Sequence, residues 1–167
     1  MLIFLDTEFT DSLDCDLISI AMVSEDGKHE LYIERSDYRA EWCNSFVHAA
    51  VLPQLGNAGP ALDRQQLADR LMTWFATLNS SVTVACDSFT DWELLIDALG
   101  DVRPANLIGR NDLQDALRSP VFQHAAVQHH EHGGHWHHAL HDARAHRQGW
   151  LVWQEQKQDP PDMPYRQ

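Results

Sequence analysis

The chain has 167 residues, 44% of them hydrophobic, with 25 acidic and 12 basic side chains and a formal net charge of −13. This length and composition are typical of one globular domain that buries its own core. The acidic excess argues against tight, sequence-independent binding of long nucleic acid, which needs a basic surface. It does not exclude a nuclease, because divalent cations can offset catalytic carboxylates locally.

Neither a secretion signal nor a membrane span is predicted. The apolar run 2–5 has no basic residue before it and ends at Asp6. No stretch approaches the ~18–20 apolar residues that cross a bilayer. The three cysteines stand at irregular spacing, which argues against a disulfide framework. We therefore expect a soluble, cytoplasmic protein, with one domain over residues 1–156 and an extended Pro-rich tail over 157–167.

Three strands are predicted at the start of the chain, over residues 2–9, 16–23 and 29–34. In the first of them, alternation places Phe4, Asp6 and Glu8 on one face. The sequence Glu-Asp-Gly-Lys over 25–28 is typical of a hairpin turn. The three strands should therefore form a meander.

Helices and strands alternate in the rest of the chain. Asp63 is a suitable N-cap, and Pro53 and Pro120 are expected to end the helical stretches before them. The expected elements are a helical stretch over 38–50, a helix from 63 to about 78, a strand at 81–86, a helix at 91–99, a short strand at 107–108, a short helix at 111–118, an irregular segment at 123–138 and a last helix from 138 to about 156. This order predicts an α/β layered domain with a mixed sheet.

Asp6 and Glu8 are the first candidate metal ligands. Two carboxylates at i and i+2 of a strand point to the same side. The apolar residues before them place the pair at the strand's end, where both can reach one ion. The alternative is a solvated strand terminus, because Asp-x-Glu is a common pattern.

His137 and Asp142 form the second candidate pair, in the run His-His-Ala-Leu-His-Asp-Ala over 137–143. Five helical residues turn two side chains about 140° apart. The pair can therefore reach one site only if His137 lies in the loop before the helix, as Gly133 and Gly134 allow. The alternative is chance, because a histidine-rich segment supplies many spacings.

A third candidate carboxylate comes after the strand at 81–86. Ser88 three residues before Asp91, at the start of a predicted helix, favours Asp91 over Asp87. We expect Asp87 to end the strand and to point away from the site. The alternative for either residue is an N-cap or a first-turn acid that only complements the helix dipole.

Together these patterns resemble the three sequence motifs of the DEDDh 3′–5′ exonuclease superfamily. Asp6-Thr7-Glu8-Phe9 resembles the first motif, Asp91 the second, and His137-x-Ala-Leu-x-Asp142-Ala the third, in the family's order and over nearly the whole chain. The resemblance implies a ribonuclease H-like fold, a five-stranded mixed sheet flanked by helices. The segments most similar to a group of small bacterial 3′–5′ exoribonucleases are 6–10, 17–27 and 51–55.

The resemblance also implies hydrolysis of short or single-stranded RNA from its 3′ end, assisted by two Mg²⁺ or Mn²⁺ ions. Asp6, Glu8, Asp91 and Asp142 would hold the ions, with Asp6 shared between them. His137 would act as general base and take the proton of the attacking water. The candidate substrate contacts are Phe9, Thr10, Ser88 and Trp136.

Two other functions use the same features. A DNA 3′–5′ exonuclease of the proofreading or repair type would share this chemistry, and the sequence has no identifiable reader of the 2′-hydroxyl. A catalytically silent binding module is the third hypothesis, and the complete set of acids argues against it. We expect a homodimer, because an acidic monomer offers little surface for a long substrate.

The remaining charged and histidine residues near the C-terminus are less specific. Arg144, His146 and Arg147 either meet phosphates or form a solvated helix face. The histidines of the segment 123–138 lack regular ligand spacing, which argues against a structural zinc site. A mobile lid over the active site is expected there.

Overall fold

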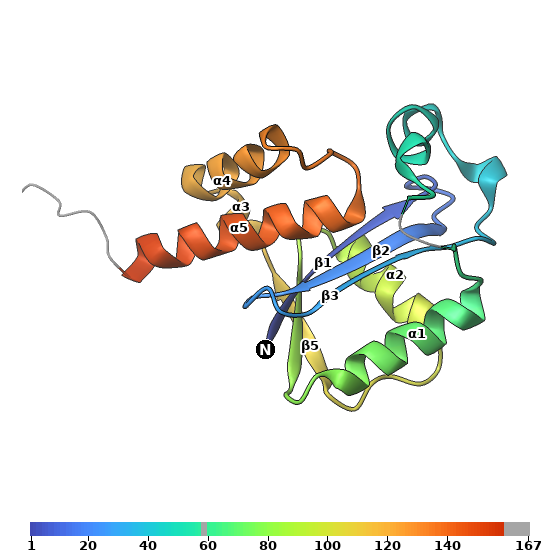
Figure 1. The fold of residues 1–167 in the computed structure, drawn as a ribbon, viewed down its shortest axis with the longest axis horizontal. Helices are drawn as coiled ribbons and strands as arrows, with labels where there is room; N and C mark the ends of the chain where they lie inside the picture. The colour runs from blue at the N-terminus through green and yellow to red at the C-terminus, as the bar shows by residue number, and fades with distance from the viewer. Residues whose placement is uncertain (58–59, 159–167) are drawn as a thin grey trace, which may run out of the picture.

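A five-stranded mixed sheet forms the centre of the structure (Figure 1), in the order β3-β2-β1-β4-β5. The computed structural model describes residues 1–57 and 60–158. The pairs β1–β2 and β2–β3 are antiparallel, and the pairs β1–β4 and β4–β5 are parallel. The strands are β1 (Leu2–Phe9), β2 (Leu17–Ser24), β3 (Glu30–Glu34), β4 (Val82–Cys86) and β5 (Leu107–Asp112). The predicted meander is confirmed, and the fifth strand is longer than expected.

The alternation of β1, in the middle of the sheet, decides what each face carries. Ile3 and Leu5 point into the larger core, where they meet α1 (Arg64–Thr77) and α2 (Phe89–Leu99). Phe4 points to the opposite face and meets Trp150 of α5 (Ala139–Gln158). Figure 1 shows α1 and α2 on one side of the sheet and α5 on the other. Asp6 and Glu8 come after Phe4 along its face and therefore lie on the α5 side.

Local capping explains where α1 begins. Asp63 accepts a hydrogen bond from the backbone N–H of Gln66 at 2.9 Å, and the Gln66 side chain accepts one from the Asp63 backbone at 3.1 Å. This reciprocal capping box satisfies two N–H groups that the first helical turn leaves unpaired. The predicted N-cap is confirmed.

The helical stretch predicted over residues 38–50 is present only in part, because no continuous helix forms there. Three short turns stand there instead: η1 (Ala40–Trp42), a 3₁₀ turn, η2 (Val47–Val51), a π-helical turn, and η3 (Leu52–Gln54), a second 3₁₀ turn. The chain is extended at Cys43, and the Asn44 side chain accepts the backbone N–H of Val47 at 2.9 Å. Such local side-chain bonds compete with a continuous helix.

The irregular segment predicted over 123–138 was wrong for residues 123–131, and only residues 132–138 are irregular. Residues 120–131 form helix α4 (Pro120–Glu131), which comes after the short α3 (Gln114–Leu117) and packs along α5. Pro120 ends the first helix and also begins the second, because proline is well tolerated in a first helical turn. The last helix continues to Gln158, so it includes the first two residues of the predicted tail; residues 159–167 lie outside the described residues.

No helix in the described ranges is both long and apolar enough to cross a membrane.

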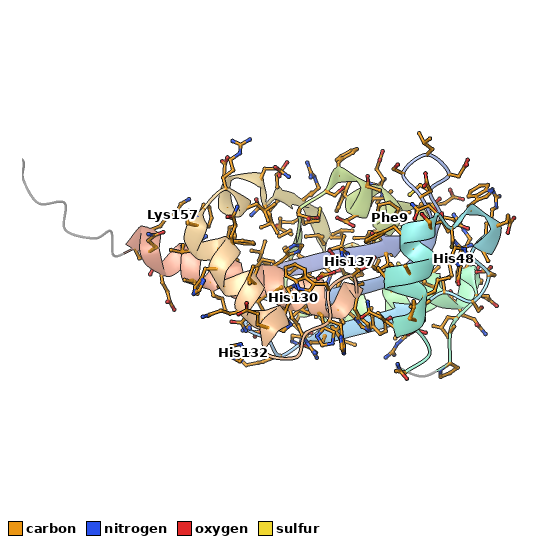
Figure 2. All side chains as sticks on the ribbon, turned by 90° about the horizontal axis from the view of Figure 1, so that it is seen from above. Phe9, His48, His130, His132, His137 and Lys157 are labelled. Carbon is orange, nitrogen blue, oxygen red and sulfur yellow. The ribbon has the colours of Figure 1, made fainter. Side chains whose placement is uncertain are left out.

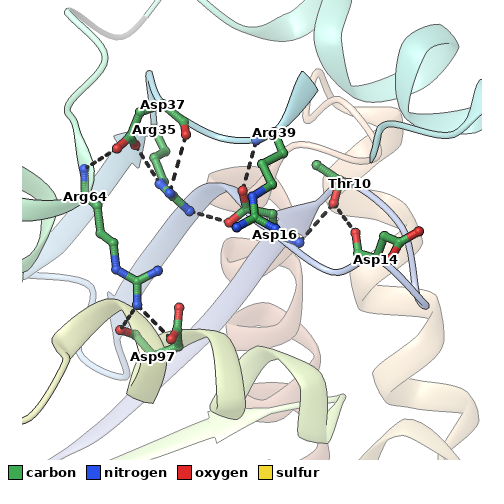
Figure 3. A network of polar contacts seen from close by, with 8 residues as sticks. All are labelled: Thr10, Asp14, Asp16, Arg35, Asp37, Arg39, Arg64 and Asp97. Atoms are coloured by element: carbon green, nitrogen blue, oxygen red, sulfur yellow. Dashed lines mark hydrogen bonds and ion pairs between the residues drawn. The ribbon is translucent and has the colours of Figure 1, made fainter. Parts of the chain in front are cut away.

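A network of arginine–aspartate pairs ties the ends of β2, β3 and α1 together (Figure 3). Arg35 is 8% exposed and bonds Asp16 at 2.5 Å and Asp37 at 2.8 Å. Arg64, at the start of α1, pairs with Asp97 of α2 at 2.8 Å. The first of these ion pairs is buried and the last is solvent-exposed, so their contributions to stability should differ.

Replacing Arg35 with alanine is expected to lower the free energy of unfolding by up to about 3–5 kcal/mol, because it removes the ionic partner of the half-buried Asp16 carboxylate, which then keeps only the Arg39 backbone N–H at 2.9 Å among the described residues. Arg64→Ala removes an exposed pair and should cost about 1 kcal/mol or less. Urea unfolding of both variants measures the difference. Equal losses of unfolding free energy would show that burial does not make the Arg35 pair more stabilising than the exposed Arg64 pair.

Candidate metal centre

A cleft of about 450 Å³ lies where the carboxyl ends of β1 and β4 meet α2, α4 and α5. Among the described residues that line it there is no lysine or arginine. Five carboxylates from four separate segments face it: Asp6, Glu8, Asp87, Asp91 and Asp142. So many acids in one partly enclosed space require counter-charge if they are to ionise together.

Three of the predicted ligands form one compact group. One carboxylate oxygen each of Asp6, Glu8 and Asp142 lie within 4.8 Å of one another. The first two share a face of β1, as the alternation requires. The third is on α5, whose Ala139 and Ala143 pack against β2, and these small side chains let the helix approach the sheet closely. This group can hold a divalent cation.

Asp87 lies in the cleft, contrary to the expectation that it would point elsewhere. One oxygen of Asp87, one of Asp6 and one ring nitrogen of His146 also lie within 4.8 Å of one another. The expectation failed because β4 runs parallel to β1 as its direct neighbour. The residue after β4 therefore arrives beside the carboxylate pair that ends β1.

Asp91 lies in the first turn of α2 and lines the same cleft, but it belongs to neither three-ligand group. Its Oδ1 accepts a hydrogen bond from Thr7 Oγ1 at 2.5 Å. Its Oδ2 is buried and has no hydrogen-bond partner within the described ranges. The contact with Thr7 reaches the face of β1 opposite to that of Asp6, so Asp91 approaches the site from the α2 side.

His137 lies in the loop before α5, as its predicted role requires. Its φ is 61°, a left-handed conformation that few residues other than glycine adopt. Its ring meets the Phe46 ring edge-on at 4.7 Å. The Gln54 side chain donates to the carbonyls of Trp136 and His137 at 2.8 and 3.0 Å. The loop is thus held against η3 while the imidazole stays exposed at the cleft.

The predicted substrate contacts divide into three that line the cleft and one that does not. Phe9 and Ser88 line it, and the Ser88 hydroxyl also caps α2. Trp136 lines it too, is 52% exposed, and stacks on His130 at 3.7 Å between ring centroids. Thr10 is buried, and its hydroxyl donates to a backbone carbonyl in the next loop at 2.6 Å. The Thr10 prediction was therefore wrong.

His130 is a site residue that the sequence did not single out. It lies on α4 and is buried. Its Nε2 is 3.3 Å from Asp142 Oδ1, and its Nδ1 is 3.1 Å from the Gly134 carbonyl. Figure 2, which views the molecule from above, labels both His130 and His137. The spacing of Phe122, Ala126 and His130 puts the three residues on one helical face. That spacing could have predicted the place of His130, but the segment was predicted to be irregular.

Of the three residues proposed from α5, only His146 lines the cleft. Arg144 pairs with Glu30 at 2.6 Å, and the Arg147 guanidinium donates to the carbonyls of Ser24 and Glu25. Both arginines therefore tie α5 to the β2–β3 hairpin.

Burial, and then mutual repulsion, raises the pKa of the clustered carboxyl groups. The pKa of Asp6 lies well above its usual value, first through burial and then through Asp91 and Asp142. Burial first, and then neighbouring carboxylates, raise the pKa of Glu8 and Asp91 to about 8. Burial also raises the pKa of Asp142 to about 7 and lowers that of His146. Divalent cations would reverse the repulsion, so the donor set fits them.

The metal-free protein is expected to lose stability as pH rises from about 4.5 to about 8. Over that range the unfolded chain releases the Glu8 proton, whose usual pKa is 4.5, and the folded chain keeps it up to about 8. The folded state then binds more protons, so stability falls with pH. Each pKa unit is worth ~1.4 kcal/mol, so the melting temperature should fall by several degrees.

Thermal unfolding in a chelator, compared with Glu8→Gln, measures this effect. The variant should gain stability over the wild type as pH rises. A difference between the two proteins that does not change between pH 5 and pH 8 would contradict the prediction.

Comparison with known proteins supports the fold. No protein-family model and no curated protein sequence matches the chain. Among solved structures it is similar to Pop2p of S. pombe in its Mg²⁺- and Mn²⁺-bound form, with a TM-score of 0.61 and 15% identity over 95% of this chain and 83% of that one. The chain thus has the predicted α/β, ribonuclease H-like fold, a five-stranded mixed sheet flanked by helices.

Proposed function

We propose that the protein is a metal-dependent 3′–5′ exonuclease that hydrolyses phosphodiester bonds at the 3′ end of short or single-stranded RNA. The observation that carries the proposal is the grouping of Asp6, Glu8 and Asp142 in one cleft that His137 also lines. These residues come from elements far apart in the chain, and each has the type and order that the resemblance requires.

The carboxylates would hold Mg²⁺ or Mn²⁺, which would stabilise negative charge on the attacking and leaving oxygens. Asp6 belongs to both three-ligand groups, so it can serve two ions at once. His137 would accept the proton of the attacking water, and its exposed place on a loop lets the ring move toward that water. His130 would hold Asp142 in place from α4.

The charge of the cleft favours a short substrate. Because none of the described residues lining the cleft is a lysine or arginine, a long polyanion has few cationic partners there. Affinity would come from the ions and from stacking of terminal bases on Phe9 and on the exposed Trp136. The 3′ polarity and the choice of RNA rest on the resemblance to small bacterial exoribonucleases.

A DNA exonuclease is the second candidate, because the same metal chemistry cuts both polymers. A catalytically silent nucleic-acid-binding module is less consistent with the site. Five clustered carboxylates would repel phosphates in the absence of cations, whereas a binding surface is usually basic.

The test is to incubate the protein with matched single-stranded RNA and DNA, labelled at the 5′ end, in Mn²⁺, in Mg²⁺ and in a chelator. Progressive shortening of the RNA from its 3′ end, with no cleavage in the chelator, is expected. Faster shortening of the DNA would favour the second candidate. Binding of either strand without shortening, at saturating metal, would contradict an exonuclease.

A further inference from the structure

Resting on the proposed function, we propose that Asp87 and His146, together with Asp6, form the second cation site, and that the imidazole makes this site favour Mn²⁺ over Mg²⁺. The cleft contains two three-ligand groups that share only Asp6. A carboxylate common to two groups is what a pair of neighbouring ions needs. Each ion then has two further ligands of its own.

The spacing of the Asp6–Asp87–His146 group suits an ion. Its three ligand atoms, which come from β1, from the end of β4 and from α5, lie within 4.8 Å of one another. His146 Nε2 is 3.7 Å from Asp87 Oδ2, which is too long for a hydrogen bond. Ligands about 2.1 Å from an octahedral ion are about 3.0 Å apart when adjacent and about 4.2 Å apart when opposite. The observed 3.7 Å between His146 Nε2 and Asp87 Oδ2 matches neither value but lies within about 0.7 Å of both, so a small side-chain movement would bring the two ligands to an ion.

No hydrogen bond holds the His146 ring in the described part of the chain. Its side chain is 13% exposed, its Nδ1 is buried without a hydrogen-bond partner, and neither ring nitrogen makes a hydrogen bond. The Phe122 ring lies 6.3 Å from its ring, centroid to centroid, which limits the space in which the imidazole can turn. Nε2, on the cleft side, is therefore the nitrogen that faces the carboxylates.

Asp91 is a poorer direct ligand for this second ion than Asp87. Its Oδ1 is already bonded to Thr7, on the other face of β1 from Asp6. The residue is only 3% exposed, and its Oδ2 has no partner in the described ranges. Because Asp91 lines the same cleft, it would support the cation indirectly, beside Asp87.

The nitrogen donor decides the preferred ion. Mg²⁺ strongly favours oxygen ligands and gives up water reluctantly. First-row transition ions accept imidazole alongside carboxylates, and Mn²⁺ is the member of that series that also suits oxygen-rich sites. A site with two carboxylates and one imidazole should therefore discriminate against Mg²⁺, whereas the Asp6–Glu8–Asp142 group, which has only oxygen ligands, should accept both ions.

The test counts ions on the metal-free protein, without nucleic acid. Mn²⁺ binding is monitored by the loss of the free-ion electron paramagnetic resonance signal, and Mg²⁺ is then added as competitor. The wild type should bind two Mn²⁺, one of which Mg²⁺ displaces poorly. His146→Gln replaces the nitrogen donor with an amide and should reduce the Mn²⁺ preference of that site about tenfold or more. Asp87→Asn should weaken the same ion and leave the other in place.

His141→Gln is the matched control, because it makes the same change on the same helix at an imidazole outside the cleft. It should keep both ions and their Mn²⁺ preference. The proposal is overturned by one bound ion in the wild type, by an unchanged preference in His146→Gln, or by an equal loss in His141→Gln.

Ion counting and cleavage can fail separately. A protein that binds two Mn²⁺ through His146 and shortens no nucleic acid would overturn only the proposed function. An active exonuclease whose ion preference is the same in His146→Gln would overturn only the second site. Circular dichroism of each variant checks that the fold is intact.

Discussion

Replacing Asp6 with asparagine is expected to abolish phosphodiester cleavage while leaving the protein folded. Asp6 is the one residue common to both three-ligand groups, so the variant weakens both ion sites together. Charge stabilisation by bound ions is worth several kcal/mol, and each ~1.4 kcal/mol is tenfold in rate. A loss of about 10³-fold or more is therefore expected at saturating Mn²⁺, measured on the labelled RNA of the exonuclease assay.

The same variant should be more stable than the wild type when no metal is present. Burial and the neighbouring carboxylates raise the pKa of Asp6, so ionising it in the folded state costs free energy. That cost grows as pH rises above the usual carboxyl range, and asparagine removes it. The gain in melting temperature should be small near pH 4 and larger near pH 8.

Asp101→Asn is a suitable control, because Asp101 is an exposed acid outside the cleft. It should leave cleavage unchanged. Activity of Asp6→Asn near that of the wild type, at saturating metal, would rule out the assignment of Asp6 as the shared ligand.

Replacing His137 with alanine is expected to reduce the cleavage rate about 10²- to 10⁴-fold, the usual contribution of a general base. His137 is the exposed imidazole at the cleft that lies on a loop rather than on a helix. Its backbone is held by Gln54, so the truncation should leave the loop in place. Metal binding should change little, because His137 belongs to neither ligand group.

His141→Ala should stay within a few-fold of wild-type activity. His141 precedes Asp142 by one residue and therefore faces about 100° away from it on α5. Its ring lies near His138 and His129 on the other side of the helix, and it does not line the cleft. Single-turnover rates of the two variants measure the contrast. Equal damage in both, with folding intact, would mean that the wrong histidine has been assigned as the base.

The sequence by itself determined the opening meander, the capping of α1, and the places of Asp6, Glu8, His137 and Asp142. These features depend on local rules. Strand alternation puts the first two acids on one face, and the helical turn requires His137 to precede α5. The resemblance to the exonuclease motifs then joined segments that no periodicity connects, and the fold that this resemblance implied is the one observed.

Only the tertiary structure placed Asp87, His130 and His146 at the cleft. Each reaches the cleft because of how its element packs: β4 lies parallel beside β1, and α4 lies along α5. Distances between such elements depend on the volumes of many side chains in the core, and no short stretch of sequence encodes them. The segment around Pro120 is a second example of structure that the local sequence does not determine. A proline can end one helix and begin the next, and the burial of Phe122 in the smaller core is a tertiary contact that stabilises the second helix there.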